Sequence, residues 1–292
     1  MPPFAAPIVV ADSITRIAEE DARGAVVVNA SHGGVYAAYL AAKLGAAAAI
    51  FNDAGVGRDR AGISGLAYLQ ELGMPAATIG HDTARIGDGA DMMARGIITH
   101  ANGLAEALGC RSGMSCRDAA KALQAAEPAR RAPPPALEAA FLLIPEPPLA
   151  WALDSASLVA PDHHDAIVLT GSHGGLLGGR PETALKYDVR AAFYNDAGIG
   201  IDEAGVSRLP ALDDRGIAAA TVSAATARIG EARSTYEDGI LSRVNRHAAA
   251  FGLAPGMPAR DAIALLRRAI VKETNRCPPP PIPPPATAPR AA

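Results

Sequence analysis

The stretch Ala25-Val-Val-Val-Asn-Ala-Ser-His-Gly-Gly34 occurs twice in this chain, because it returns as Ala166-Ile-Val-Leu-Thr-Gly-Ser-His-Gly-Gly175. In each copy an apolar, β-branched run ends abruptly at Ser-His-Gly-Gly, and in the first copy an alanine-rich segment of helical character follows. This pattern is typical of a buried parallel strand that leads through a tight glycine turn into the N-terminus of a helix. The stretch therefore predicts an α/β architecture.

The similarity between the two parts of the chain extends well beyond this stretch. A shift of 143 residues places residues 52–123 on residues 195–266 without a gap. The sequence therefore predicts an internal tandem duplication. Two further polar motifs coincide in this alignment: Asn-Asp-Ala-Gly at 52–55 and 195–198, and Thr-Ala-Arg-Ile-Gly at 83–87 and 226–230.

Proline-rich segments mark the boundaries of the two predicted repeats. The segment between the repeats contains Pro133-Pro134-Pro135 and Pro147-Pro148, although Phe141-Leu-Leu-Ile144 within it is apolar enough to pack on another part of the protein. The chain from Cys277 onward is typical of an extended or polyproline-like tail. The predicted segments are a first repeat over 1–127, a linker over 128–148, a second repeat over 149–276 and a tail over 277–292.

Within the first repeat, apolar runs predict strands at 7–10, 25–30, 46–51 and 75–79. Capping residues and glycines predict helices over 12–23, 35–44, 61–72 and about 88–108, and a short one that starts near 115. Alternation of strands and helices predicts a repeated β-α-β-α-β-α unit, with parallel sheet and helices on both faces. Two such units predict pseudo-two-fold symmetry, either in one doubly wound sheet or in two separate lobes.

Composition excludes several classes of protein. The chain has 292 residues, of which 49% are hydrophobic and 20% charged, as in ordinary globular proteins. Its net charge of −3, pI near 6.2 and 4% aromatic content do not predict a nucleic-acid partner. No apolar run has the length of a membrane span, so no membrane partner is predicted either.

The N-terminal residues lack the features of a secretory signal, and the three cysteines match no metal or redox spacing. A cytoplasmic location is the simplest interpretation. The oligomeric state stays open, with a homo-oligomer as one alternative.

The repeated polar motifs all follow the carboxyl ends of predicted strands. Ser-His-Gly-Gly follows one strand, Asn-Asp-Ala-Gly the next and Thr-Ala-Arg-Ile-Gly the third. In open parallel sheets this edge binds ligands, because helix N-termini and strand-end loops converge there. We therefore expect one composite cleft at the junction of the repeats, with both Ser-His-Gly-Gly turns in its walls.

Several of these residues favour an anionic ligand. The backbone N–H groups of paired glycines suit an anion at a helix start, and arginine offers a fork for a carboxylate or phosphate. The predicted substrate-binding residues are Gly33, Gly34, Asn52 and Arg85 in the first repeat, and Gly174, Gly175, Asn195 and Arg228 in the second.

Other residues of the same motifs suit catalysis. Histidine exchanges a proton near neutral pH, aspartate orients a histidine or takes a proton, and serine serves as a nucleophile or a hydrogen-bond donor. His81-Asp82, replaced by Ala224-Ala225 in the second repeat, favours the first repeat if only one carries the chemistry. The predicted catalytic residues are Ser31, His32, Asp53, Ser172, His173 and Asp196.

Each motif also has a purely structural interpretation. The serines cap the following helix, Asn-Asp-Ala-Gly forms an Asx turn, and the arginine pairs with an aspartate. The histidines are harder to explain in this way, because turn formation does not need them.

Sequence motifs for cofactors are absent from both repeats. Neither G-x-G-x-x-G, a P-loop, H-E-x-x-H nor paired C-x-x-C occurs, so no cofactor and no metal is predicted. A divalent metal held by His32, Asp53 and His81 from three loops remains a minority alternative.

Together these observations favour an enzyme that acts on a small anionic, carboxylate-bearing metabolite. Hydrolysis and acid/base lyase or isomerase chemistry both remain open. The alternative is a regulatory module that binds a phosphate or nucleotide at the same edge without chemistry.

Overall fold

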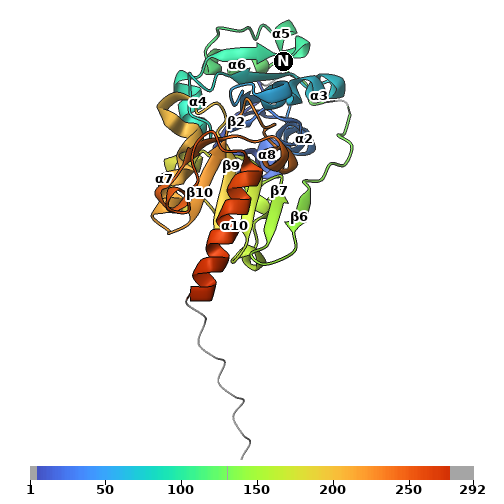
Figure 1. Cartoon of the computed structure of the whole chain (residues 1–292). Helices are drawn as coiled ribbons and strands as arrows, with labels where there is room; N and C mark the ends of the chain where they lie inside the picture. The colour runs from blue at the N-terminus through green and yellow to red at the C-terminus, as the bar shows by residue number, and fades with distance from the viewer. Residues whose placement is uncertain (1–4, 130, 277–292) are drawn as a thin grey trace, which may run out of the picture.

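The computed structural model describes residues 5–129 and 131–276, so the predicted tail over 277–292 lies outside the described residues. Two β-sheets form the framework (Figure 1). The first has five strands in the order β1 (Ile8–Ala11), β2 (Val26–His32), β3 (Ala48–Asn52), β4 (Ala76–Ile79) and β5 (Ile98–Ala101). The second has six in the order β11 (Leu241–Val244), β10 (Ala218–Val222), β9 (Ala191–Asn195), β8 (Ile167–His173), β7 (Ala150–Leu153) and β6 (Ala140–Ile144).

Parallel pairing joins β1 through β4 and β7 through β10, which confirms the predicted α/β class. Three outer strands run antiparallel to their neighbours: β5 to β4, β11 to β10 and β6 to β7. Both sheets are therefore mixed but mostly parallel, so the predicted parallel pairing holds for the inner strands and not for these three outer ones.

The antiparallel strand β5 lies where the sequence predicted one long helix over about 88–108. Instead α4 (Gly89–Arg95) ends at Gly96, β5 follows, and α5 (Gly103–Ala107) starts after Asn102. The helix ends because the β-branched pair Ile98-Thr99 favours a strand and Asn102 caps a new helix, accepting a hydrogen bond from the N–H of Ala105 at 3.0 Å. The second sheet has the same order, with α8 (Ala232–Glu237), β11 and α9 (Arg246–Ala250).

The other helices differ from the predicted ones mainly at their starts. Residues 12–23 form a 3-10 turn and the short α1 (Glu19–Ala22) instead of one helix, and α3 (Gly65–Leu72) follows a 3-10 segment. The remaining α-helices are α2 (Val35–Lys43), α6 (Cys116–Leu123), α7 (Arg208–Asp213) and α10 (Ala259–Arg276). The 3-10 helices are Ile14–Arg16, Arg58–Ile63, Ala156–Leu158, Pro161–His163, Leu177–Gly179, Pro181–Thr183 and Ile201–Val206.

The segments after β2 and β8 differ in a way that two aligned positions explain. Helix α2 follows β2 and packs on α3, where a Cβ on Gly65 would lie 2.6 Å from the Cβ of Ala38. After β8 the chain forms two short 3-10 turns, and Arg208 stands in the position of Gly65. Its guanidinium fills the space left without a helix and donates to the carbonyl oxygens of Gly175 (2.9 Å) and Ala184 (2.8 Å).

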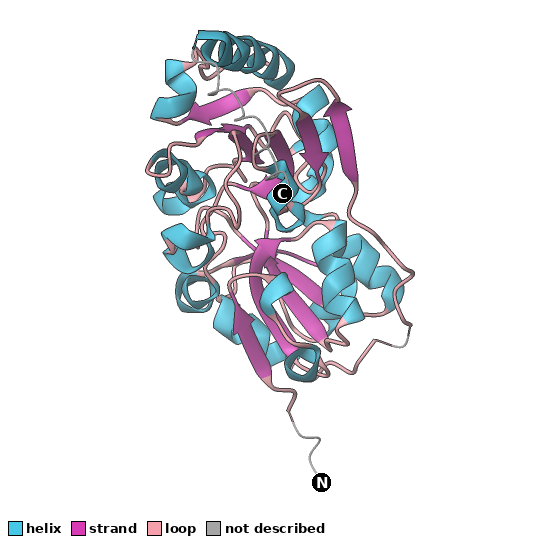
Figure 2. Cartoon of the chain, turned by 90° about the horizontal axis from the view of Figure 1, so that it is seen from below, coloured by secondary structure: helices cyan, strands magenta, loops and turns pink. Residues whose placement is uncertain are grey.

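The loops at the strand ends join the N-terminal and C-terminal parts of the chain (Figures 1 and 2). Gly55 meets Gly198 so closely that a Cβ on Gly55 would lie 2.9 Å from the Cα of Gly198. Backbone hydrogen bonds run from Arg58 to Ala224 (2.8 Å) and from Ile201 to His81 (2.9 Å). A buried apolar cluster takes three residues from each side: Ala54, Ala61 and Ile86, and Ala197, Ala204 and Ile229.

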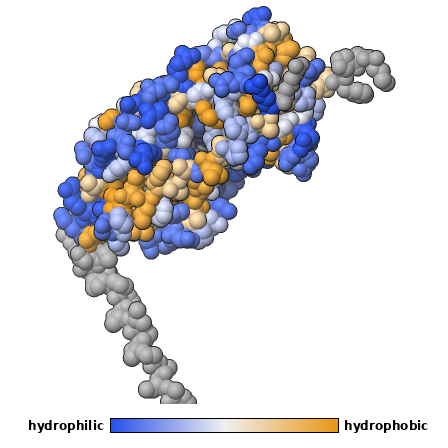
Figure 3. Space-filling view, turned by 90° about the vertical axis from the view of Figure 1, so that its right-hand side faces the viewer, coloured by the Kyte–Doolittle hydropathy of each residue, from blue (hydrophilic) through white to orange (hydrophobic). Residues whose placement is uncertain are grey.

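Part of the predicted linker belongs to a sheet, because residues 140–144 form the edge strand β6. Leu142 on this strand is 44% exposed. Figure 3 views the side of the molecule on which β6 lies and shows a hydrophobic area on the lower part of that face.

Within residues 5–129 and 131–276, none of the helices combines the length and apolar character needed to cross a bilayer.

Candidate functional site

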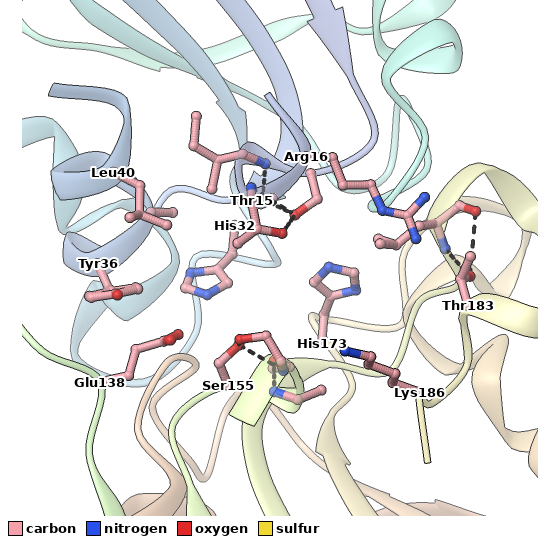
Figure 4. A pocket seen from close by; sticks show the side chains of 18 of the residues that line it. Thr15, Arg16, His32, Tyr36, Leu40, Glu138, Ser155, His173, Thr183 and Lys186 are labelled. Carbon is pink, nitrogen blue, oxygen red and sulfur yellow. Dashed lines mark hydrogen bonds between the residues drawn. The ribbon is translucent and has the colours of Figure 1, made fainter. Parts of the chain in front are cut away.

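The two Ser-His-Gly-Gly turns lie in the wall of one pocket, called the central cleft here (Figure 4). The cleft has a volume of about 230 Å³ and takes its walls from both parts of the chain. His32, at the end of β2, and His173, at the end of β8, stand side by side across its middle. Other lining residues are Ser13, Arg16, Ser31, Tyr36, Leu40, Glu138, Ser155, Ser172, Thr183, Lys186 and Arg208.

Backbone N–H groups fix the protonation of both cleft histidines. The N–H of Gly34 donates to Nδ1 of His32, and the N–H of Gly175 donates to Nδ1 of His173, each at 3.1 Å. Burial lowers the pKa of His32 to about 4, and burial followed by the charge of Arg208 holds the pKa of His173 well below its usual range. Both imidazoles are therefore neutral near pH 7, and the hydrogen-bond network assigns the proton to Nε2.

This protonation changes the role that the sequence suggested for the histidines. A neutral imidazole with its proton on Nε2 donates a hydrogen bond to a ligand but has no free lone pair to accept a proton. His32 and His173 are therefore suited to stabilise negative charge in the cleft, and the geometry does not favour them as general bases.

Each cleft histidine packs against a glycine from the opposite part of the chain. A Cβ on Gly230 would lie 3.3 Å from Cε1 of His32, and a Cβ on Gly87 would lie 3.5 Å from Cε1 of His173. Both glycines end a Thr-Ala-Arg-Ile-Gly motif and adopt positive φ angles, +89° and +82°. The third repeated motif thus contributes backbone to the site, which keeps the two rings in place.

The paired glycines do not offer their N–H groups to a ligand, contrary to the prediction. Gly33 and Gly174 donate to the carbonyl oxygens of the asparagines at the ends of the adjacent strands, at 2.9 and 2.8 Å. Gly34 and Gly175 donate to the histidines. The physical reason is that each turn packs against the ends of its own strand and of the adjacent strand, so these four N–H groups are already satisfied.

The two serines lie beside the histidines without hydrogen-bonding to them among the described residues. The Oγ of Ser31 accepts from the N–H of Ile14 (3.1 Å), and the Oγ of Ser172 accepts from the N–H of Ala156 (2.9 Å). Each serine thereby holds the start of a 3-10 turn at the rim of the cleft. A serine nucleophile with a histidine base would need a hydrogen bond between the two.

The predicted aspartates lie outside the central cleft. Asp53 is 2% exposed and accepts from Nδ1 of His81 at 2.9 Å, from the N–H of His81 and from the hydroxyl of Thr99. Asp196 accepts from the N–H of Ala224 at 2.8 Å. These carboxylates therefore order the loops between the two parts of the chain and do not orient the cleft histidines.

The predicted asparagines also serve the loops. Asn52 accepts from the N–H of Ala54, and Asn195 accepts from the N–H of Ala197, each at 2.9 Å. Both side chains are fully buried. They form the Asx turns that the structural interpretation of the motif describes.

The two predicted arginines take part in ion pairs. Arg85 pairs with Asp91 (3.1 Å) and Asp88 (3.2 Å) away from the central cleft. Arg228 pairs with Asp59 (2.9 Å) and Glu231 (2.8 Å) at a neighbouring hollow of about 400 Å³. That hollow shares with the cleft His32, Tyr36, Glu138, Ser155 and Ser172.

The central cleft is lined by three cationic side chains that differ from the two predicted arginines. Arg16, Lys186 and Arg208 line it, and none of the three pairs with a carboxylate among the described residues. Arg16 aligns with Leu158 and Arg208 with Gly65, so the sequence similarity between the two parts did not point to them, whereas the shift of 143 residues places Lys186 on Lys43. One signal was present for Arg208: an arginine replaces a glycine at an aligned position.

Glu138 is the carboxylate of the cleft and was also missed. It belongs to the predicted linker over 128–148 and faces the cavity beside Tyr36 and His32 (Figure 4). Burial raises its pKa, the hydrogen bond from Ser155 opposes this shift, and Asp154 adds to it. A carboxyl group with a raised pKa in a cleft is suited to exchange a proton.

Within the described residues, no group of three or more His, Cys, Asp or Glu lies close enough together to hold a metal ion. His32 faces the cleft, while His81 and Asp53 bond to each other elsewhere. The three residues of the minority metal alternative therefore do not converge.

Comparison with known proteins adds no assignment. Neither protein-family models, curated protein sequences nor solved structures give a significant match to this chain.

Proposed function

We propose that this protein is an enzyme that moves a proton on a small anionic metabolite, in the manner of an isomerase or lyase. The observation that carries this proposal is the pair of neutral imidazoles in one cleft, each fixed as an Nε2–H donor by a backbone N–H. Two such donors stabilise the oxyanion that forms when a carbon next to a carbonyl group loses a proton.

Glu138 is the group that exchanges the proton in this proposal. Its carboxylate removes a proton from the carbon next to the carbonyl, and the C–H electron pair becomes the C=C bond of an enolate. The carbonyl oxygen then carries the negative charge and accepts hydrogen bonds from His32 and His173. Return of the proton to the opposite face of that carbon gives an isomer, and loss of a leaving group from the next carbon gives a lyase product, so neither outcome needs a further reactant.

Hydrolysis is less well supported by the same geometry. Ser31 and Ser172 accept hydrogen bonds from backbone N–H groups, and neither cleft histidine has a free lone pair to activate them. Binding of a phosphate or nucleotide by the glycine turns is disfavoured too, because their N–H groups are occupied.

We further propose that the cleft is a composite site derived from an internal duplication. The aligned residues His32 and His173, each packed on a glycine of the opposite part, support a pseudo-two-fold arrangement with one site per chain. Such a site requires a histidine from both repeats, which explains why both copies of the motif are present.

Deuterium uptake tests the proposed function directly. The protein is incubated in D₂O with a panel of short 2-oxo and 3-oxo acids, and loss of the proton next to the carbonyl is followed by NMR. We expect catalysed exchange on at least one acid. His32→Phe and His173→Phe should each lower the rate by about 10² to 10³, as loss of an oxyanion donor does, and Glu138→Gln should abolish it.

His164→Phe provides the matched control, since the side chain of His164 is 72% exposed and lies outside the central cleft. It should leave the exchange rate unchanged. Equal exchange in the wild type and in both cleft variants would refute the role of the histidine pair.

A further inference from the structure

The central cleft has two chemically different ends. On the side of His173 lie Arg16 and Lys186, whose side chains stand next to the cavity, and on the side of His32 lie Tyr36, Leu40 and Glu138 (Figure 4). One end therefore carries positive charge, and the other combines apolar surface with a carboxylate. A ligand that fits both ends has a charged group at one terminus only.

Arg208 strengthens the charge of the cationic end. Its residue is 5% exposed, so its guanidinium has lost most of its contact with water. Its hydrogen bonds go to two backbone carbonyls, and its guanidinium carbon lies 5.0 Å from the centre of the Tyr194 ring. Burial of a cation without a carboxylate is costly, and an anion bound in the adjoining cleft would offset that cost.

The other arginines at the strand-end loops show what the cationic end lacks. Arg85, Arg95 and Arg228 each contact at least two carboxylates within 4.0 Å. Within residues 5–129 and 131–276, Arg16, Lys186 and Arg208 contact none, although all three line one cavity. This end therefore carries positive charge that no carboxylate of the described residues neutralises, which favours an anionic ligand.

We infer that the central cleft binds a short 2-oxo monocarboxylic acid in a single orientation. Its carboxylate lies at the end formed by Arg16, Lys186 and Arg208, and its 2-oxo oxygen accepts from the two histidines. The next carbon faces Glu138, and a short apolar chain lies against Tyr36 and Leu40. This inference rests on the proposed function, because it assigns the histidines and Glu138 the same roles.

The size of the cleft limits the chain length. At about 230 Å³ the cavity is smaller than ordinary ligand pockets of roughly 300–1,000 Å³. A 2-oxo acid of four or so carbons is of suitable size. A second carboxylate would lie beside Glu138, where two negative charges repel each other.

Binding of three probes tests the inference by calorimetry. 2-Oxobutyrate is the monocarboxylate, 2-oxobutanamide is the uncharged analogue of the same shape, and 2-oxoglutarate carries a second carboxylate. We expect 2-oxobutyrate to bind at one site per chain and at least tenfold more tightly than either comparison probe. NMR signals of the His32 and His173 rings should shift on binding, which places the probe in the cleft.

Variants of the cationic end complete the test. Arg16→Gln with Lys186→Gln changes two exposed side chains and should weaken 2-oxobutyrate binding at least tenfold. Arg208→Lys keeps the charge but loses the planar fork, and should weaken binding while a thermal melt confirms folding. The matched control is Arg180→Gln, since Arg180 is an exposed neighbour that pairs with Asp12 outside this cavity.

The inference is overturned if 2-oxobutyrate does not bind, if either comparison probe binds as tightly, or if the double variant retains full affinity. Because binding is measured without turnover, the two proposals fail separately. Tight, charge-dependent binding without deuterium exchange would refute the proposed reaction but would still support the inferred orientation of the bound acid. Exchange that survives in the double variant with unchanged KM would refute the orientation and keep the reaction.

Discussion

The backbone N–H of Gly34 donates to Nδ1 of His32 at 3.1 Å, two residues back along the chain. The hydrogen bond uses the lone pair of Nδ1 and so places the ring proton on Nε2. Gly175 and His173 repeat this relationship at the same distance. The Ser-His-Gly-Gly turn thus decides which ring nitrogen of its histidine carries the proton. The sequence motif alone does not reveal this.

The first testable consequence concerns stability at acidic pH. Because the pKa of His32 falls from 6.5 to about 4 on folding, the unfolded chain binds more protons than the folded one between these values. Stability should therefore decrease as the pH falls from 6.5 toward 4, and a shift of this size corresponds to about 3 kcal/mol. Urea unfolding at several pH values should show a smaller decrease for His32→Phe than for the wild type. Identical pH slopes for both would contradict the assignment of a neutral His32.

A second prediction concerns the glycine that packs on His173. Gly87 and Gly73 both have φ of +82°, but a Cβ on Gly87 would lie 2.2 Å from the carbonyl oxygen of Leu176, whereas Gly73 has nothing within 4 Å. Gly73→Ala should cost about 1–2 kcal/mol from backbone strain alone. Gly87→Ala should cost clearly more, because the clash adds to the same strain. Equal denaturation midpoints for the two variants would show that the loop of Leu176 moves without cost.

A third prediction concerns the Asp53–His81 pair at the junction of the two parts. His81→Ala leaves the buried Asp53 without its imidazole partner and should destabilise the protein by about 1–3 kcal/mol. The hydrogen bond to Asp53 raises the pKa of His81, so the stabilisation is fully present below pH 6.5 and is lost as the pH rises through the raised value. The difference in unfolding free energy between wild type and variant should thus be larger at pH 6 than at pH 9. A difference that stays constant with pH would rule out a charged pair.

The fourth prediction concerns stoichiometry. If the central cleft is one composite site, calorimetry should find one 2-oxobutyrate per chain, and either His32→Phe or His173→Phe should weaken it. Two sites per chain, of which each variant removes only one, would mean that the two motifs act independently.

Local pattern determined much of the fold in this chain. The apolar runs that end at Ser-His-Gly-Gly place β2 and β8 within about two residues of their observed ends, because strand burial and glycine turns are encoded by neighbouring residues. The segment over 88–108 shows the limit of this reasoning. Its apolar spacing fits a helix. In the structure, however, α4 ends at Gly96 and α5 begins after Asn102, and the strand β5 between them pairs with β4.

The candidate site divides in the same way. The residues next to His32 and His173 in the chain are enough to place both histidines at the ends of buried strands. Which groups meet the histidines depends on tertiary packing: Arg208 reaches the cleft because no α-helix directly follows β8, and Glu138 reaches it from the predicted linker over 128–148. Arg85 is held elsewhere by Asp88 and Asp91. The partners of these side chains depend on which charged groups and carbonyl oxygens the folded chain brings into contact with them. A local sequence pattern does not encode those contacts.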